Sequence, residues 1–142
     1  MKSLNQLLAA KGGQVYSIRP DATVLDALKL MAQKDVGALL VMEDTRVIGI
    51  LSERDYARKV ILQGKSSQDV PVREIMTADV VKVDPSKTVE DCMGLMTQRR
   101  VRHLPVCEGD RLIGLVSIGD LVKEVIAEQE QTIKQLESYI HS

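Results

Sequence analysis

Apolar residues along the chain follow two spacings, and the order of these spacings occurs twice. A short β-rich run, VYSI at 15–18 or VVKV at 80–83, is followed by a proline and then by apolar residues three and four positions apart. Short apolar runs predict strands, and the three–four spacing predicts a helix. Further apolar runs follow the two predicted helices at 38–42, 47–52, 103–107 and 112–117. Each half of the chain therefore predicts β-α-β-β, with a second helix after the serine that ends the last strand.

Both expected helices carry a capping signal at the N-terminus. Thr23 precedes Asp26 by three residues, and Thr88 stands in the same relation to Asp91. The threonine hydroxyl of such a capping box satisfies an amide of the first turn, and the acidic side chain bonds back to the cap residue.

The two halves of the chain are copies of one sequence unit. Sliding the sequence against itself by 65 residues, from Pro20 to Pro85, aligns the two halves without a gap. Because a single unit would leave one face of its sheet uncovered, we expect two units packed as one pseudo-twofold module of the α/β (α+β) class. The predicted divisions are a first repeat at 14–63, a linker at 64–74, a second repeat at 75–127 and a C-terminal helical extension at 128–142.

The last helix continues beyond the second repeat and carries a heptad-like stripe. Its members are spaced four and three apart in alternation: Val122, Ile126, Gln129, Ile133, Leu136 and Ile140. This spacing is that of a coiled-coil seam with one polar position. The stripe either packs back on its own domain or contacts a second subunit, and the second interpretation predicts a homodimer.

Composition limits the possible partners. Of the 142 residues 44% are hydrophobic and 27% are charged, and the net charge is −1. This is the profile of a globular protein with no electrostatic reason to bind nucleic acid or an anionic membrane. No signal peptide and no apolar run of ~18 residues is evident, so we expect a cytoplasmic protein. Cys92 and Cys107 are expected to be reduced, buried thiols, and with His103 and His141 they are too few for a metal site.

Ser-x-x-Asp recurs after the last strand of each half, as Ser52 with Asp55 and as Ser117 with Asp120. One interpretation is a further capping box. The other is a ligand site, since a glycine three residues before each serine lets a ligand approach the strand, and a helix N-terminus accepts phosphate. An ionised aspartate can accept two hydrogen bonds from a ribose diol. No nucleophile lies with a base nearby, so we do not expect an enzyme.

GILSERD, GLVSIGD and the strand entry VRHLPV, in this order of elements, resemble tandem CBS domains, the Bateman module. SERDYARK, EIMT and SIGDLVKEVIAEQ are similar to small stand-alone bacterial CBS-pair proteins. The resemblance implies a non-catalytic regulatory module that binds an adenosine nucleotide in clefts between the repeats and senses energy or redox state. AMP is the favoured ligand, and ATP or NAD(H) are alternatives. The competing hypothesis is a structural dimerisation module with vestigial sites.

The resemblance also implies roles for particular residues. The aspartates hold the ribose and the serines lie near phosphate. The adenine is flanked by Ser17, Ile18, Val81 and Val83. Phosphate is met by Arg102 and His103, although His103 can equally be a simple strand-entry histidine. The copies differ here, because Gly37 and Ala38 replace the Arg102–His103 pair in the first repeat, and Arg54 stands where the second repeat has Gly119. The two phosphate environments are therefore unequal.

Overall fold

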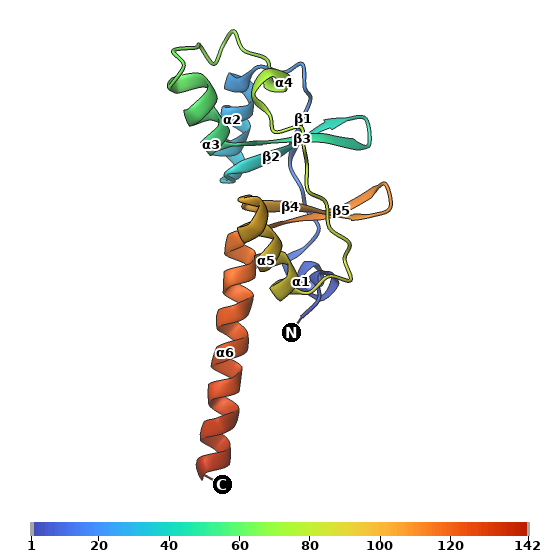
Figure 1. The fold of residues 1–142 in the computed structure, drawn as a ribbon, viewed down its shortest axis with the longest axis vertical. Coiled ribbons are helices and arrows are strands. Elements are labelled where there is room, and N and C mark those ends of the chain that lie inside the picture. Colours follow the sequence, from blue (N-terminus) through green and yellow to red (C-terminus); the bar gives the residue numbers. More distant parts are fainter. Residues whose placement is uncertain (1, 142) are drawn as a thin grey trace. The chain divides into compact units, whose positions relative to one another are not determined.

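The computed structural model describes residues 2–141, and these form two compact units (Figure 1). The first unit contains residues 14–81 and 110–112. The second contains residues 82–109, the N-terminal residues up to 13 and the residues from 113 onward. The order of helices and strands confirms the predicted mixed α/β fold with two repeats and a long C-terminal helix.

A three-stranded sheet organises the first unit. Strand β1 (Ser17–Ile18) pairs in parallel with β2 (Ala38–Glu43), which pairs antiparallel with β3 (Arg46–Ser52). The hairpin between β2 and β3 turns at Asp44, whose φ of 57° lies in the left-handed region that aspartate tolerates better than most residues. The predicted hairpin is thus confirmed, with each strand extended by one residue.

Helices cover this sheet and complete its core. They are α2 (Val24–Lys34), α3 (Glu53–Tyr56), the π-helical η1 (Ala57–Ile61) and α4 (Val72–Ile75). Thr23 caps α2, because its hydroxyl accepts a bond of 3.1 Å from the Asp26 N–H, but the predicted return bond from the Thr23 N–H to Asp26 is not among the bonds of the described residues. In the core cluster that these helices form with the sheet, the residues that are at most 1% exposed are Val24, Ala27, Leu39, Val41, Leu51, Val60, Val72 and Ile75. The last part of the predicted linker is therefore a helix that belongs to the core.

The second unit has a two-stranded sheet and three helices. The helices are α1 (Leu4–Lys11), α5 (Val89–Arg99) and α6 (Ile118–His141). The strands are β4 (His103–Glu108) and β5 (Arg111–Ser117), whose first two residues are grouped with the first unit. The Thr88–Asp91 capping box of α5 is present in full, and Gly109, with a φ of 62°, turns the β4–β5 hairpin. Cys92 and Cys107 are both buried in this unit, and burial raises the pKa of the Cys92 thiol to about 11. Both thiols are buried as expected.

The predicted strand at 80–83 is wrong except at its last residue. Only Val83 pairs with a strand, in a parallel bridge to Val106. The reason is that the preceding residues belong to the first unit, where Thr77 pairs with Ile50, and the chain enters the second unit only at Lys82. The Val80 N–H bonds locally to Ala78 O at 3.0 Å instead of joining a ladder.

Each repeat packs against the short helix that precedes the other repeat in the sequence. In the second unit, the Leu4 N–H at the start of α1 donates to Lys87 O at 2.8 Å. In the first unit, the Val72 N–H at the start of α4 makes the same contact with Ala22 O, also at 2.8 Å. Ala22 and Lys87 are equivalent positions of the repeat. Helices α1 and α4 therefore occupy equivalent positions in the two units. Each of them precedes one repeat in the sequence but packs in the unit of the other repeat.

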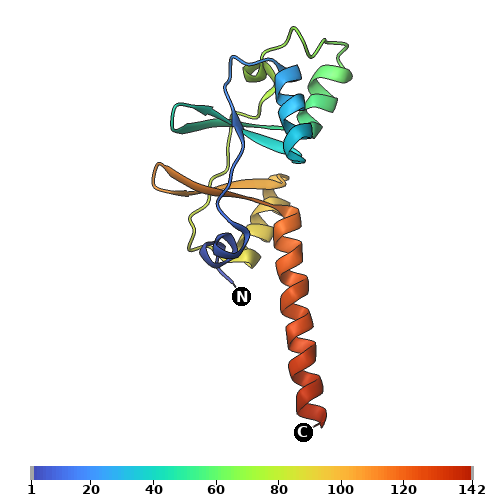
Figure 2. The same cartoon turned by 180° about the vertical axis from the view of Figure 1, so that it is seen from behind.

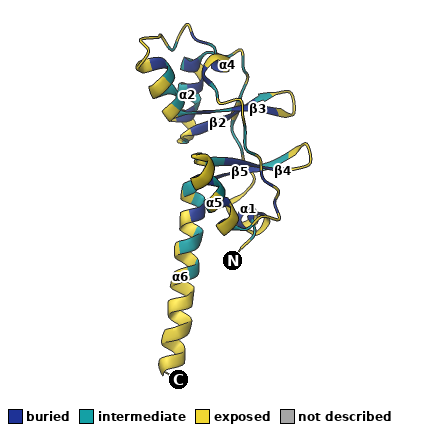
Figure 3. Cartoon of the chain, in the orientation of Figure 1, coloured by how far each residue is buried: buried dark blue, intermediate teal, exposed yellow. Residues whose placement is uncertain are grey.

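The C-terminal helix α6 extends away from the rest of its unit, as Figure 2 shows, and its second half is exposed (Figure 3). Ile133 is 53% exposed, Leu136 58% and Ile140 75%. The interpretation in which this stripe packs back on its own domain is therefore wrong for its second half. Over residues 2–141, no helix combines the length and the apolar character needed to cross a bilayer.

Candidate ligand site

Both Ser-x-x-Asp motifs form capping boxes at the junction of a strand and a helix. The Ser52 N–H donates to Asp55 Oδ2 at 3.0 Å, and the Asp55 N–H donates to Ser52 Oγ at 3.2 Å. The corresponding distances between Ser117 and Asp120 are 2.8 Å and 3.2 Å. The capping hypothesis is confirmed in both repeats. Capping uses Oδ2 of each carboxylate and does not by itself decide whether the aspartate also binds a ligand.

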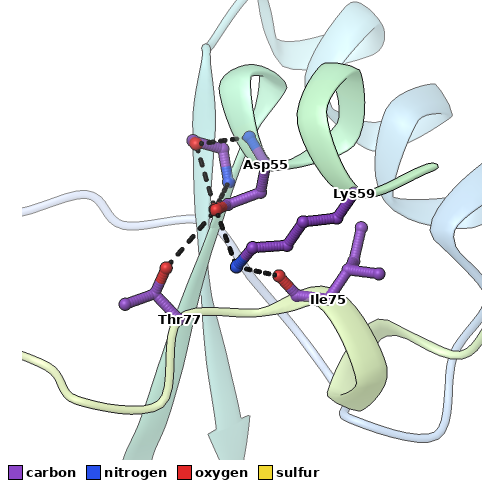
Figure 4. Close-up of polar contacts among 5 residues, drawn as sticks. Asp55, Lys59, Ile75 and Thr77 are labelled. Atoms are coloured by element: carbon purple, nitrogen blue, oxygen red, sulfur yellow. Dashed lines mark hydrogen bonds and ion pairs between the residues drawn. The ribbon is translucent and has the colours of Figure 1, made fainter. Parts of the chain in front are cut away.

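Asp55 has further partners on its second oxygen, as Figure 4 shows. The Thr77 hydroxyl donates to Asp55 Oδ1 at 3.4 Å, and Lys59 Nζ lies 3.2 Å from the same oxygen. Lys59 Nζ also donates to Ile75 O at 3.0 Å. The first repeat thus surrounds its aspartate with a cap, a hydroxyl and an ammonium group.

Asp120 meets a lysine from a different element. Lys11 Nζ, at the end of α1, donates to Asp120 Oδ2 and to Leu115 O, the latter at 2.7 Å. Burial raises the pKa of the Asp120 carboxyl, but the bonds from Lys11 and Ser117 lower it by more, so its pKa lies below the ordinary value. Asp120 is therefore ionised at neutral pH, as an acceptor for a diol must be.

These two lysines and Thr77 were missed by sequence reasoning. The i,i+4 spacing of Asp55 and Lys59 on one helix face was a local signal for the first contact. A signal for α1 was also present, because Ser3 and Gln6 form a capping box just before an apolar spacing. No local pattern points to the contact between Lys11 and Asp120.

The strand-entry residues lie beside the helix starts within their own units. The Ile118 N–H donates to Arg102 O at 2.9 Å, and the Glu53 N–H donates to Gly37 O at 3.0 Å. In the second unit this brings Arg102 and the adjacent His103 to the Ser117–Asp120 motif. In the first unit the same place holds a glycine, and the exposed Arg54 supplies the positive charge.

The proposed site residues divide between the units. The first unit holds Ser17, Ile18, Ser52, Arg54, Asp55 and Val81, and the second holds Val83, Arg102, His103, Ser117 and Asp120. Among the adenine-flanking candidates, Ser17 is exposed, Ile18 and Val81 are half-buried, and Val83 is buried at 7% exposure. Val81 and Val83 are therefore not brought together in one unit.

The glycine three residues before each serine makes room for another segment of the same chain. The expectation that it makes room for a ligand is therefore wrong. A Cβ at Gly49 would lie 2.6 Å from Met76 Sδ, and a Cβ at Gly114 would lie 2.7 Å from Leu8 Cδ2. Met76 follows α4 and Leu8 lies in α1, so both glycines allow the exchanged helix to approach the strand.

His103 is held in a partly buried environment that disfavours its charged form. Burial lowers the pKa of His103, and Lys11 and Arg102 lower it further, while Asp120 opposes them. The imidazole is therefore neutral at pH 7 and offers one N–H donor.

This pKa predicts a pH dependence of stability. Because the folded-state pKa lies below the ordinary 6.5, the unfolded chain binds more protons as the pH falls below 6.5. We expect the free energy of unfolding, measured by urea titration, to decrease from pH 7 to pH 5, and His103→Gln to reduce this decrease. His141→Gln, at the exposed end of α6, is the matched control and should behave as the wild type. An unchanged slope in His103→Gln would contradict the assignment.

Metal-binding and family comparisons complete the description of the site. Among residues 2–141 no three His, Cys, Asp or Glu side chains are grouped so that they could hold a metal ion.

The sequence model of the CBS-domain family matches residues 13–61 and 72–127. The CBS domain-containing protein YhcV of Bacillus subtilis is 38% identical over 108 residues, which cover 76% of each chain.

A plant relative and a solved structure give the same result. The mitochondrial CBS domain-containing protein CBSX3 of Arabidopsis thaliana is 45% identical over 125 residues, which cover 84% of this chain and only 61% of that relative's length. A putative signal-transduction protein with CBS domains from Burkholderia ambifaria is 53% identical, with a TM-score of 0.87, and the match covers 90% of this chain and 96% of that one. The chain belongs to the CBS-domain family and carries two copies of the domain in tandem.

Proposed function

We propose that the chain is a non-catalytic regulatory module that binds an adenosine nucleotide at Asp55 and Asp120 and thereby senses energy or redox state. One observation carries the proposal. Both halves of a duplicated chain place a carboxylate at a helix start, beside a serine and a lysine, although the residues between serine and aspartate are unrelated. Such a group can hold a ribose diol while the serine and the nearby basic residues meet phosphate.

The ligand class has some outside support. A CBS domain pair that is 19% identical, with a TM-score of 0.79, was crystallised with 5′-methylthioadenosine and S-adenosyl-L-methionine. At this identity the likeness shows the fold alone, so the proposal rests on the residues of this chain. AMP is the first candidate, and ATP and NAD(H) follow. Ser17, Ile18, Val81 and Val83 are the proposed neighbours of adenine.

A search for bound and added nucleotide tests the proposal. Protein purified without added ligand is denatured with acid, and the supernatant is examined for the ultraviolet absorbance of adenine. A thermal-shift screen with AMP, ATP, NAD(H) and adenosine follows. We expect at least one of them to raise the melting temperature. If none does and no nucleotide is released, the chain is a structural dimerisation module with vestigial sites.

Arg102 is proposed to contact phosphate, and its removal separates this role from a structural one. Arg102→Ala should weaken AMP more than adenosine, because a charge-assisted bond to phosphate is lost while the ribose contacts remain. Arg99→Ala removes a nearby exposed arginine and serves as the control. Calorimetry that gave equal losses for the two ligands would assign Arg102 a structural role.

We also propose that α6 pairs with α6 of a second subunit to form a homodimer. A hexameric CBS-CP12 protein from bloom-forming cyanobacteria, 33% identical with a TM-score of 0.77, shows that a related chain assembles. A chain truncated after Ala127 should dissociate at concentrations where the full chain is a dimer by light scattering. Leu136→Lys in the seam should act similarly, and Gln135→Lys beside it should not. A monomeric full chain at micromolar concentration would contradict the coiled-coil interpretation.

The location proposed for the module is the cytoplasm, although one relative is mitochondrial. Fractionation of cells that express the tagged chain would test this.

A further inference from the structure

Both Ser-x-x-Asp aspartates are held by a lysine from outside the motif. Lys59 Nζ lies 3.2 Å from Asp55 Oδ1 and donates to Ile75 O, while Lys11 Nζ donates to Asp120 Oδ2 and to Leu115 O. The two lysines are not equivalent in the duplication. Glu124 occupies the place of Lys59 in the second repeat, and Lys11 precedes the first repeat altogether. The chain therefore forms the same ammonium–carboxylate contact twice from different residues.

The partners of Asp55 leave little room for a ligand. A carboxylate offers about four acceptor positions. The Ser52 N–H and hydroxyl each donate to Oδ2 at 3.0 Å, while Thr77 and Lys59 take Oδ1. A ribose diol brings two further donors, so it needs to displace two existing partners.

The partners on Oδ1 are the ones that can leave. The Ser52 contacts belong to the cap of α3 and are lost only if the helix start opens. The Thr77 bond is long at 3.4 Å, and the Lys59 side chain is 40% exposed, so both can turn to water. Partly exposed ion pairs of this kind are weak and are screened by salt.

Asp120 is less fully occupied. Its Oδ2 accepts from the Ser117 N–H and from Lys11, and the Ser117 side chain also helps to lower the pKa of this carboxyl. Within the part of the chain that the structure describes, no group donates to Asp120 Oδ1. A diol can thus begin to bind Asp120 before any protein contact breaks.

Building on the proposed function, we propose that Lys59 and Lys11 compete with the ribose of the ligand for Asp55 and Asp120, so that binding releases each lysine. The Asp120 site fills first, because one of its oxygens is open. Release of Lys11 also frees Leu115 O and detaches the end of α1 from β5 and α6. The bound state therefore differs from the unbound state in how α1 is held within its unit.

Adenosine is the probe that isolates this competition, because it carries no charge. Salt weakens the lysine–aspartate pair. Adenosine carries no charge, so salt does not screen its contacts with the aspartate in the same way. The adenosine affinity of each site is measured by calorimetry at low and high sodium chloride. The Asp120 site is measured in Asp55→Asn protein, and the Asp55 site in Asp120→Asn protein. We expect the affinity to rise about two- to fivefold between ~20 mM and ~500 mM salt.

Lysine variants then show whether Lys11 and Lys59 cause the salt dependence. Lys11→Met and Lys59→Met should bind adenosine more tightly at low salt and lose the salt dependence at their own sites. Lys2→Met is the matched control, because Lys2 also pairs with an acidic residue of α6, Glu124 at 3.3 Å, but touches neither aspartate. Adenosine binding that ignores salt in the wild type, or salt dependence that survives both Lys→Met changes, would overturn the competition. Absence of adenosine binding at every salt concentration would overturn the competition, and only absence of AMP, ATP and NAD(H) binding as well would overturn the proposed function.

Discussion

Leu4→Ala is expected to destabilise the protein by about 2–5 kcal/mol, the usual cost of removing a fully buried leucine side chain. Leu4 is 0% exposed, because α1 packs into the core of the second unit. The change leaves the backbone bond from Leu4 N–H to Lys87 O available, so the loss reports on packing. Urea unfolding gives the magnitude.

Leu62→Ala is the matched control for this prediction. Leu62 is 78% exposed, and its loss should cost under ~0.5 kcal/mol. A loss below about 1 kcal/mol for Leu4→Ala would show that α1 is not part of the core.

The position of the damage tests the exchange of helices. Leu4→Ala should reduce hydrogen-exchange protection mainly in β4, β5 and α5. Ile75→Ala, in α4, removes a side chain that is 1% exposed and should reduce protection mainly in β2 and β3. The opposite distribution would mean that each helix stabilises the repeat that follows it in sequence.

The local parts of the fold were predictable from the sequence, because their signals lie within a few residues. The capping pairs, such as Thr88 with Asp91, needed only a spacing of three. The hairpins needed only apolar runs with a short turn between them. The capping interpretation of the motif that starts with Ser52, one of two that the sequence left open, is confirmed, and the repeat itself was visible from a gapless alignment.

The exchange of α1 and α4 was not predictable, because it depends on contacts between distant segments. The equivalent helices stand in a register that differs from that of the repeats, since Ser3 bridges Thr88 while Pro71 bridges Thr23. The gapless alignment therefore concealed their equivalence. The exchanged helices approach Gly49 and Gly114, and without knowledge of this contact the glycines were interpreted as openings for a ligand. The VVKV strand was predicted too long because its first residues still belong to the first unit.

The candidate site was also predictable only in those parts that depend on a local pattern. Its serines and aspartates follow from a local pattern, and the Ile118 N–H at the start of α6 donates to Arg102 O. Lys11 was invisible because it lies 109 residues from Asp120 in the chain. The charge of Asp120 is thus balanced by a lysine that only the folded chain brings near, whereas the charge of Asp55 is balanced by Lys59, four residues away in the sequence.

The largest expected effect on ligand binding comes from Asp55→Asn combined with Asp120→Asn. A ligand that binds only the folded state at a hundredfold excess over Kd stabilises it by about 2.7 kcal/mol. In a chain of this size that corresponds to a rise of roughly 5–11 °C in Tm. The asparagines keep an acceptor for the serine N–H groups but remove the charge that is proposed to face the ribose diol. The double variant should lose almost all of the rise caused by AMP, and Asp120→Asn alone should lose more than Asp55→Asn, because Asp120 has the open oxygen.

The AMP-induced rise in Tm distinguishes binding from capping in this experiment, and the ligand-free stability reports the loss of the caps and ion pairs. Each change also removes an ion pair with Lys59 or Lys11, so we expect the ligand-free protein to lose under ~1 kcal/mol per site. Asp91→Asn is the matched control, because Asp91 accepts a cap bond from the Thr88 N–H at 3.2 Å and lies outside the motif. It should lower ligand-free stability and leave the AMP-induced rise intact. If the double variant retained the full wild-type rise, the aspartates would be caps alone, and the nucleotide would bind elsewhere on the protein.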